Sequence, residues 1–160
     1  MKRVGFILIS VLLAAGAAGF AGSLFGGDDG TEVITKGYRF TEGPYWHEDG
    51  YLLFSDIPAN KVYKWNPESG AEVFLDSSGH SNAIKGGPDG SLILAQHTGR
   101  VSKYTQDGGF KTLADSYQGK RLNSPNDLTI HSNGTIYFTD PPYGVSQEER
   151  ELDFCGVYRL

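Results

Sequence analysis

Three side chains with oxygen donors recur at the same offset from three turn signals. Glu42, Asn82 and Asn126 each lie eight residues before the glycine of an Asp-Gly or Asn-Gly pair. One carboxylate and two carboxamides are the donors that a hard cation takes, and Ca²⁺ accepts irregular coordination by about six to eight oxygens. Any one of these residues alone would be read as a turn cap or the start of a strand. The shared offset is what predicts a cation site.

The turn signals belong to a repeat, which sets the elements that must position these side chains. The pairs Asp49-Gly50, Asp89-Gly90 and Asn133-Gly134 are followed by the apolar runs YLLFSD, SLILAQ and TIYFTD, and their glycines lie 40 and 44 residues apart. Such pairs favour tight hairpins because both turn positions need positive φ, so each is expected to join an inner strand to a second strand. Third and fourth strands are predicted at KVYKWN (61–66), RVSKYT (100–105), GVYRL (156–160), AEVFLD (71–76) and FKTLAD (110–115).

Four short antiparallel strands in each unit of about 40 to 45 residues are typical of the blade of a β-propeller. A sandwich with accidental spacing is the alternative. The innermost strands of a propeller line its central channel, so Glu42, Asn82 and Asn126 are expected to face one level of that channel. The chain holds two blades and three strands of another, whereas propellers close with about 4 to 8 blades. We therefore expect it to be the truncated N-terminal part of a longer protein.

The N-terminus carries a targeting segment. Lys2 and Arg3 precede an apolar run that contains no charge before Asp28, and its strongly apolar part is only about ten residues long. Residues 1–21 are predicted to be a signal peptide, with an uncleaved membrane anchor as the alternative, and residues 22–37 a linker or entry strand. The protein is accordingly expected to be exported, either periplasmic or secreted, and to contact a membrane only if this segment is retained.

Composition supports a globular all-β protein and excludes some partners. The chain is 39% hydrophobic, and its 22 glycines and 7 prolines are spread through the body, as in a fold with many turns. The formal net charge is −5 and becomes −7 without residues 1–21. Such a charge disfavours nucleic acid and anionic membranes. Cys155 is the only cysteine, so no internal disulfide can form, and we expect its thiol to be at least half-buried.

The stretches EGPYW, LLFSDIPANKVYKW, PDGSLILAQHTGRV and RLNSPNDLTIHSNGTIYFTDPPYG, with GVYRL after them, resemble the senescence-marker-protein and gluconolactonase (regucalcin-like) family of six-bladed propellers. The resemblance covers residues 38–160. It implies one divalent cation in the channel, usually calcium. Glu42 matches the ligand of the first blade and Asn126 the first asparagine ligand, whereas Asn82 takes a position that lines the channel. The remaining ligands and the general base would lie beyond Leu160, so the chain alone should be inactive.

The resemblance also implies the chemistry, which is calcium-dependent hydrolysis of a sugar lactone. The cation would polarise the carbonyl, and water would attack it. Arg121 and His97 are further candidates for substrate contact, although a lone histidine is more often structural, and Asp127 is expected to orient a neighbour or balance charge. Two alternatives remain open. One is a phosphotriesterase of the calcium-propeller type, and the other is a non-catalytic propeller that binds a sugar or a protein.

Two further pairs of residues are assigned structural roles. Asp56 and Asp140 occupy the same repeat position after the second strand and are expected to cap turns there. Trp46 and Trp65 are expected to pack between blades.

Overall fold

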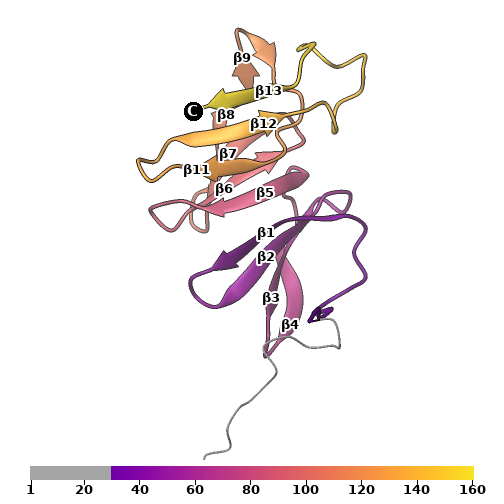
Figure 1. Ribbon diagram of the computed structural model, residues 1–160, viewed down its shortest axis with the longest axis vertical. Coiled ribbons are helices and arrows are strands. Elements are labelled where there is room, and N and C mark those ends of the chain that lie inside the picture. Colours follow the sequence, from indigo (N-terminus) through magenta and orange to yellow (C-terminus); the bar gives the residue numbers. More distant parts are fainter. Residues whose placement is uncertain (1–29) are drawn as a thin grey trace, which may run out of the picture. The chain divides into compact units, whose positions relative to one another are not determined.

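The computed structural model describes residues 30–160, so the predicted signal peptide lies outside the described residues. Residues 35–160 form one compact unit. This unit contains strands and no helix, which confirms the all-β prediction (Figure 1). Within the described range, nothing helical is long and apolar enough to cross a membrane.

The strands form the repeated sheets that the sequence predicts. The first and second sheets have four antiparallel strands each and the third has three, always in sequence order (Figure 1). Their strands are β1 (Thr41–His47), β2 (Tyr51–Asp56), β3 (Lys61–Asn66) and β4 (Gly70–Leu75), then β5 (Ser81–Gly86), β6 (Leu92–Gln96), β7 (Arg100–Thr105) and β8 (Gly109–Ala114), then β11 (Leu128–Ile130), β12 (Ile136–Asp140) and β13 (Gly156–Arg159).

A short hairpin between the second and third sheets was not predicted. Strands β9 (Ser116–Tyr117) and β10 (Lys120–Arg121) pair through a turn at Gln118 and Gly119, both of which have positive φ. Glutamine seldom adopts that conformation, so the pair gives a weak turn signal in the sequence. The hairpin occupies the longer connection that separates the second turn glycine from the third.

The hairpin turns between inner and second strands lie where the sequence predicts them, but their geometry differs. The glycines Gly50, Gly90 and Gly134 have positive φ, whereas the Asp or Asn before each does not. Each glycine N–H donates to the carbonyl three residues earlier, as from Gly50 to His47 at 3.0 Å. This pattern indicates a type I turn followed by a left-handed glycine, so only one turn position needs positive φ.

Alternation along β6 places the second sheet between two apolar cores. Leu92 and Leu94 pack against the first sheet, with Leu53 and Val62. Ile93 and Ala95 belong to the other core, with residues of the third sheet such as Phe138. Because successive side chains of a strand point to opposite faces, one fully buried strand serves both interfaces.

Asp56 and Asp140 do have the same structural role, although it is not the capping of a following turn. Asp56 accepts the backbone N–H groups of Arg39 and Phe40 at 3.0 and 3.2 Å. Asp140 accepts the N–H of Asn123 at 2.8 Å, the same 17 residues upstream. Each carboxylate therefore fixes the segment that leads into the innermost strand of its own sheet.

One expectation about an individual side chain is wrong, because Cys155 is exposed rather than half-buried. Trp46 is 56% exposed on β1 and does not pack between the described sheets, so its packing between blades stays a prediction.

Candidate functional site

The three candidate side chains lie where the innermost strands are irregular. The β1–β2 register shifts between Glu42 and Tyr45, and the β5–β6 register shifts between Ser81 and Ile84, around Asn82. A bulge of this kind re-aims a side chain away from the regular alternation. The local sequence favours the first of these irregularities, because proline follows Gly43 directly and Gly43 has φ of +57°.

The third sheet repeats this irregularity just before its inner strand begins. The N–H of Asn126 donates to the carbonyl of Thr139 at 2.9 Å, and the N–H of Thr139 donates to the carbonyl of Asp127 at 3.0 Å. Asn126 and Asp127 together therefore lie opposite the single residue Thr139, which is the pattern of a β-bulge. Asn126 precedes β11 rather than lying within it.

Backbone contacts bring the three positions into one row. A Cβ at Gly43 would overlap the carbonyl oxygen of Asn82 and lie 2.9 Å from the Cα of Ala83, so β1 approaches β5 very closely. On the other side, the N–H of Ala83 donates to the carbonyl of Asn126 at 3.1 Å. The predicted proximity of Glu42, Asn82 and Asn126 therefore has a structural basis in contacts between neighbouring sheets.

Glu42, Asn82 and Asn126 line two cavities in common. One, of about 260 Å³, follows the inner strands and is also lined by Pro44, Lys85 and Asp127, among others. The other, of about 400 Å³, opens where strands end, and its remaining lining residues are Phe40, Ile57, Pro58, His97 and Tyr143. The three oxygen-bearing side chains thus lie between a strand-lined cavity and a cavity at the loop ends, which we call the loop-end cavity.

The free donor atoms fit a hard cation. Within residues 30–160, no hydrogen bond or ion pair uses the carboxylate of Glu42 or the side-chain amide of Asn126. Asn82 is only 6% exposed, and among the described residues its side-chain amide has one hydrogen-bond partner, Nε2 of His97. In the same range, no three His, Cys, Asp or Glu side chains are placed to hold one metal ion by themselves. A cation bound there would need the amide oxygens as well as the carboxylate, a donor set that Ca²⁺ accepts.

His97 contacts the site through Asn82. Its Nε2 lies 3.4 Å from Nδ2 of Asn82, and its backbone N–H donates to the carbonyl of His80 at 3.0 Å. Burial lowers the pKa of His97, and nearby His80 lowers it further. A neutral imidazole can accept a hydrogen bond from the amide, which would leave the oxygen of Asn82 free for a ligand.

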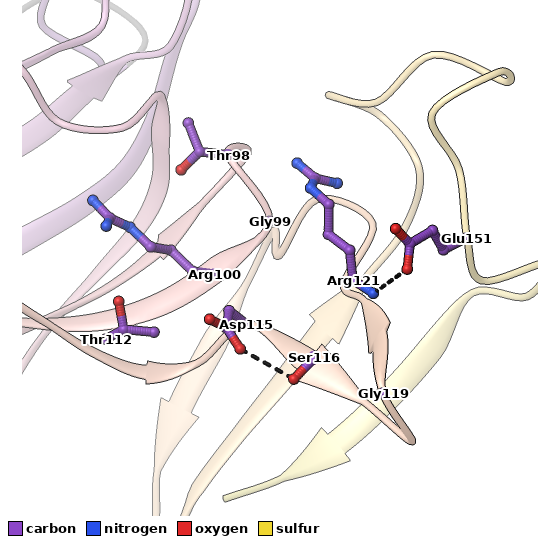
Figure 2. A pocket seen from close by; sticks show the side chains of 9 residues that line it. All are labelled: Thr98, Gly99, Arg100, Thr112, Asp115, Ser116, Gly119, Arg121 and Glu151. Atoms are coloured by element: carbon purple, nitrogen blue, oxygen red, sulfur yellow. Dashed lines mark hydrogen bonds between the residues drawn. The ribbon is translucent and has the colours of Figure 1, made fainter.

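Asp127 and Arg121 lie in different surroundings. Asp127 lines the strand-lined cavity, and its Oδ1 accepts the N–H of Leu128 at 2.8 Å. Arg121 lines neither of the two cavities. It lines a separate one of about 490 Å³, with Arg100 and Glu151 among its neighbours (Figure 2).

Arg121 is held by the backbone that leads toward Asn126. Its Nη1 donates to the carbonyls of Leu122 and Asn123 at 2.7 and 2.9 Å. Its backbone N–H donates to Oε2 of Glu151 at 2.7 Å, as Figure 2 shows. The structure therefore does not bring Arg121 together with the three oxygen-bearing side chains.

Sequence reasoning missed Lys85 and the aromatic residues Phe40 and Tyr143 as lining residues. Lys85 follows Asn82 by three residues, and the bulge between them decides which face each side chain takes. Tyr143 lies in a Pro-Pro-Tyr-Gly turn, which signals a loop but not the cavity beside it.

The repeated four-stranded antiparallel sheets, with polar side chains on their innermost strands, define the class as a β-propeller with blade repeats. Residues 40–160 match the family model described as the SMP-30/Gluconolactonase/LRE-like region. The chain belongs to this family.

Curated and solved relatives agree with this assignment. A gluconolactonase of Zymomonas mobilis subsp. mobilis is 40% identical over 151 residues, which cover 81% of this chain and 42% of that protein. A pentonolactonase of Haloferax volcanii is 34% identical, with 67% and 36% covered. The structure of a gluconolactonase from Xanthomonas campestris superposes with a TM-score of 0.73 at 32% identity, over 79% of this chain and 46% of that one. The chain thus spans less than half the length of these relatives.

Proposed function

We propose that this protein is a calcium-dependent hydrolase of sugar lactones. The observation that carries the proposal is the row formed by Glu42, Asn82 and Asn126 beside a cavity open at the loop ends. Sequence similarity supports hydrolysis of a lactone as the reaction, because curated relatives are named gluconolactonase and pentonolactonase. Another divalent cation with similar oxygen preference would fit the same donors.

Glu42, Asn82 and Asn126 would contribute one charged and two neutral ligands to the cation. When bound, the cation supplies Lewis acidity that polarises the lactone carbonyl. The amide nitrogen of Asn82 lies 3.4 Å from Nε2 of His97, and an unprotonated Nε2 there would accept from the amide and leave the amide oxygen directed away from the histidine. The loop-end cavity would receive the lactone. No described residue is assigned as the general base.

Export forms part of the proposal. Its support is the sequence of residues 1–21, with Lys2 and Arg3 before a short apolar run. The proposed enzyme would therefore act on lactones outside the cytoplasm.

A lactone assay with and without chelation tests the function. The protein expressed from its complete gene is incubated with D-glucono-1,5-lactone, and acid release is followed with a pH indicator against the spontaneous rate in buffer. We expect hydrolysis above that rate, its loss with a chelator, and its recovery with added Ca²⁺. Activity that survives complete chelation would contradict the cation dependence. Failure to hydrolyse any aldonolactone would contradict the proposed reaction.

A further inference from the structure

Tyr143 lies on a turn that two neighbouring segments hold in place. The hydroxyl of Ser124 donates to the carbonyl of Pro141 at 3.1 Å and accepts the N–H of Gly144 at 2.6 Å. Ser124 itself is fully buried. The prolines before Tyr143 restrict the backbone further, because each fixes its own φ. The turn is therefore fixed to the segment that carries Asn126.

The other side of the turn rests on His97. A Cβ at Gly144 would lie 2.6 Å from Cβ of His97 and 2.9 Å from its Nδ1, so only glycine allows this approach. The turn thus lies between the segment that carries Asn126 and the histidine that contacts Asn82. Both neighbours line the loop-end cavity, as Tyr143 does.

The ring of Tyr143 remains open to solvent despite this fixed backbone. It is 76% exposed, and its hydroxyl makes no hydrogen bond within the described part of the chain. Phe40, more than half exposed, lines the same cavity from the segment before β1. The loop-end cavity therefore has polar side chains at its inner end, namely Glu42, Asn82 and Asn126, and exposed aromatic rings at its opening. An aromatic side chain with a fixed backbone gives contact area at low entropic cost.

We propose that Tyr143 is a substrate-binding residue whose ring packs against the C–H face of a sugar-lactone ring. This inference rests on the proposed function. A sugar lactone presents hydroxyl groups at its edge and C–H groups on its faces, so it suits a cavity with an aromatic ring on one side and polar groups at its inner end. The ring of Tyr143, rather than its hydroxyl, makes the contact.

Steady-state kinetics on D-glucono-1,5-lactone test the inference. Four forms of the protein from its complete gene are compared: wild type, Tyr143→Ala, Tyr143→Phe and Tyr117→Ala. Tyr117 is a matched control because it is a partly exposed tyrosine that lines neither cavity shared by Glu42 and Asn126. We expect Tyr143→Ala to raise KM about three- to tenfold with kcat nearly unchanged, as for loss of one aromatic contact made equally in ground and transition states. Tyr143→Phe and Tyr117→Ala should keep the wild-type KM.

The outcomes separate this inference from the function on which it rests. If the wild type is active and Tyr143→Ala has the same KM, only the proposed role of Tyr143 is overturned and the proposed function stands. A loss in Tyr143→Phe equal to that in Tyr143→Ala would also overturn it, because the hydroxyl and not the ring would then be responsible. A wild type that hydrolyses no sugar lactone would overturn both proposals. Thermal unfolding of each variant shows whether a change in KM reflects misfolding.

Discussion

The backbone N–H of Ala83 donates to the carbonyl oxygen of Asn126 at 3.1 Å, across the junction between the second and third sheets. Asn82 precedes Ala83, so this one bond sets the spacing between two candidate ligands. Gly43 provides the matching contact on the other side, where its backbone lies against the carbonyl of Asn82. The candidate site is thus built by main-chain contacts between neighbouring sheets, and it should respond to changes that alter those contacts without removing any ligand.

Gly43→Ala should disrupt the site without removing a ligand. The new Cβ would overlap the carbonyl of Asn82, and the positive φ adds strain. We expect a loss of about 1–2 kcal/mol from the left-handed conformation and about 1–3 kcal/mol more from overpacking, with weaker calcium binding. Gly50→Ala is the control, because Gly50 has φ of +82° but open space around it. Urea unfolding and calorimetric titration measure the stability and the calcium affinity of both variants. Equal values for Gly43→Ala and Gly50→Ala would show that the close contact at Gly43 does not position the site.

Glu42→Gln should weaken calcium binding at least about tenfold, because it removes the one carboxylate among the three described candidate ligands, the other two being neutral amides. Asp127→Asn is the matched control. Asp127 carries the same charge beside the site, but its Oδ1 is engaged with the N–H of Leu128. Calorimetric titration of the three proteins compares the affinities directly. Equal affinities for wild type and Glu42→Gln would exclude Glu42 as a ligand.

Asp140 should be needed as a hydrogen-bond acceptor rather than as a charge. Its side chain is fully buried and accepts the N–H of buried Asn123. Burial raises the pKa of Asp140, against the opposing effect of the N–H groups of Asn123 and Ser124. We expect Asp140→Ala to cost about 1–3 kcal/mol, since it leaves a buried N–H unpaired, and Asp140→Asn clearly less. Equal losses in urea unfolding would show that the charge itself matters.

The repeat made the sheets predictable from the sequence. Strand positions follow from apolar alternation and from turn glycines, both of which act locally, so the predicted second and third strands match β2, β3, β6 and β7 to within a residue. The shared offset of Glu42, Asn82 and Asn126 in the sequence corresponds to equivalent positions in the structure, because each repeat has a bulge at the same place.

Features that depend on contacts between distant segments could not be read in the same way. The exposure of Trp46 depends on what its strand packs against, and the position of Arg121 depends on a hairpin with an unusual Gln-Gly turn. Asp56 and Asp140 showed their shared position in the sequence, but their partners lie 16 and 17 residues upstream. The inclusion of Tyr143 in the loop-end cavity likewise depends on Ser124 and His97.

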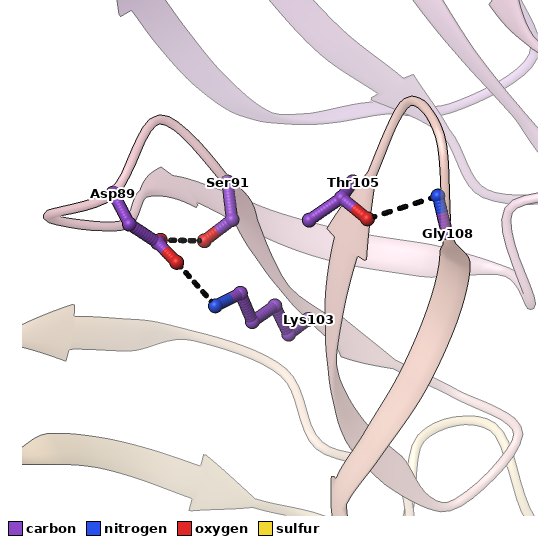
Figure 3. Close-up of polar contacts among 5 residues, drawn as sticks. All are labelled: Asp89, Ser91, Lys103, Thr105 and Gly108. Atoms are coloured by element: carbon purple, nitrogen blue, oxygen red, sulfur yellow. Dashed lines mark hydrogen bonds and ion pairs between the residues drawn. The ribbon is translucent and has the colours of Figure 1, made fainter.

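The turn that contains Asp89 should show a pH-dependent contribution to stability. Lys103 donates to the carboxylate of Asp89, and the Ser91 hydroxyl donates to it at 2.6 Å (Figure 3). These hydrogen bonds, with that of Lys103 the larger effect, hold the pKa of Asp89 well below its ordinary value. An unfolded aspartate has a pKa of about 3.9, so the stabilisation is present above that pH and is lost as pH falls below it toward the folded pKa.

The comparison of wild type with Asp89→Asn measures this contribution. The difference in unfolding free energy should shrink as the pH is lowered from about 5 to about 2. Because the pair is exposed, about 1 M salt should also reduce the difference. A difference that stays constant with both pH and salt would show that the pair does not stabilise this turn.

Arg121 should act on the fold and not on substrate affinity. Its guanidinium donates to the carbonyls of Leu122 and Asn123, and a Cβ at Gly99 would lie 2.6 Å from its Cζ, so it fills the space between two loops. Lysine cannot reproduce this planar group with several donors. We therefore expect Arg121→Lys to lower the thermal midpoint of unfolding while the KM for D-glucono-1,5-lactone stays within about twofold of wild type.

Arg100→Lys is the control for this prediction. Arg100 lines the same separate cavity but donates to the Gln96 side chain instead of to the segment leading to Asn126. A large rise in KM for Arg121→Lys without loss of thermal stability would instead assign Arg121 to the substrate, as the family resemblance first suggested.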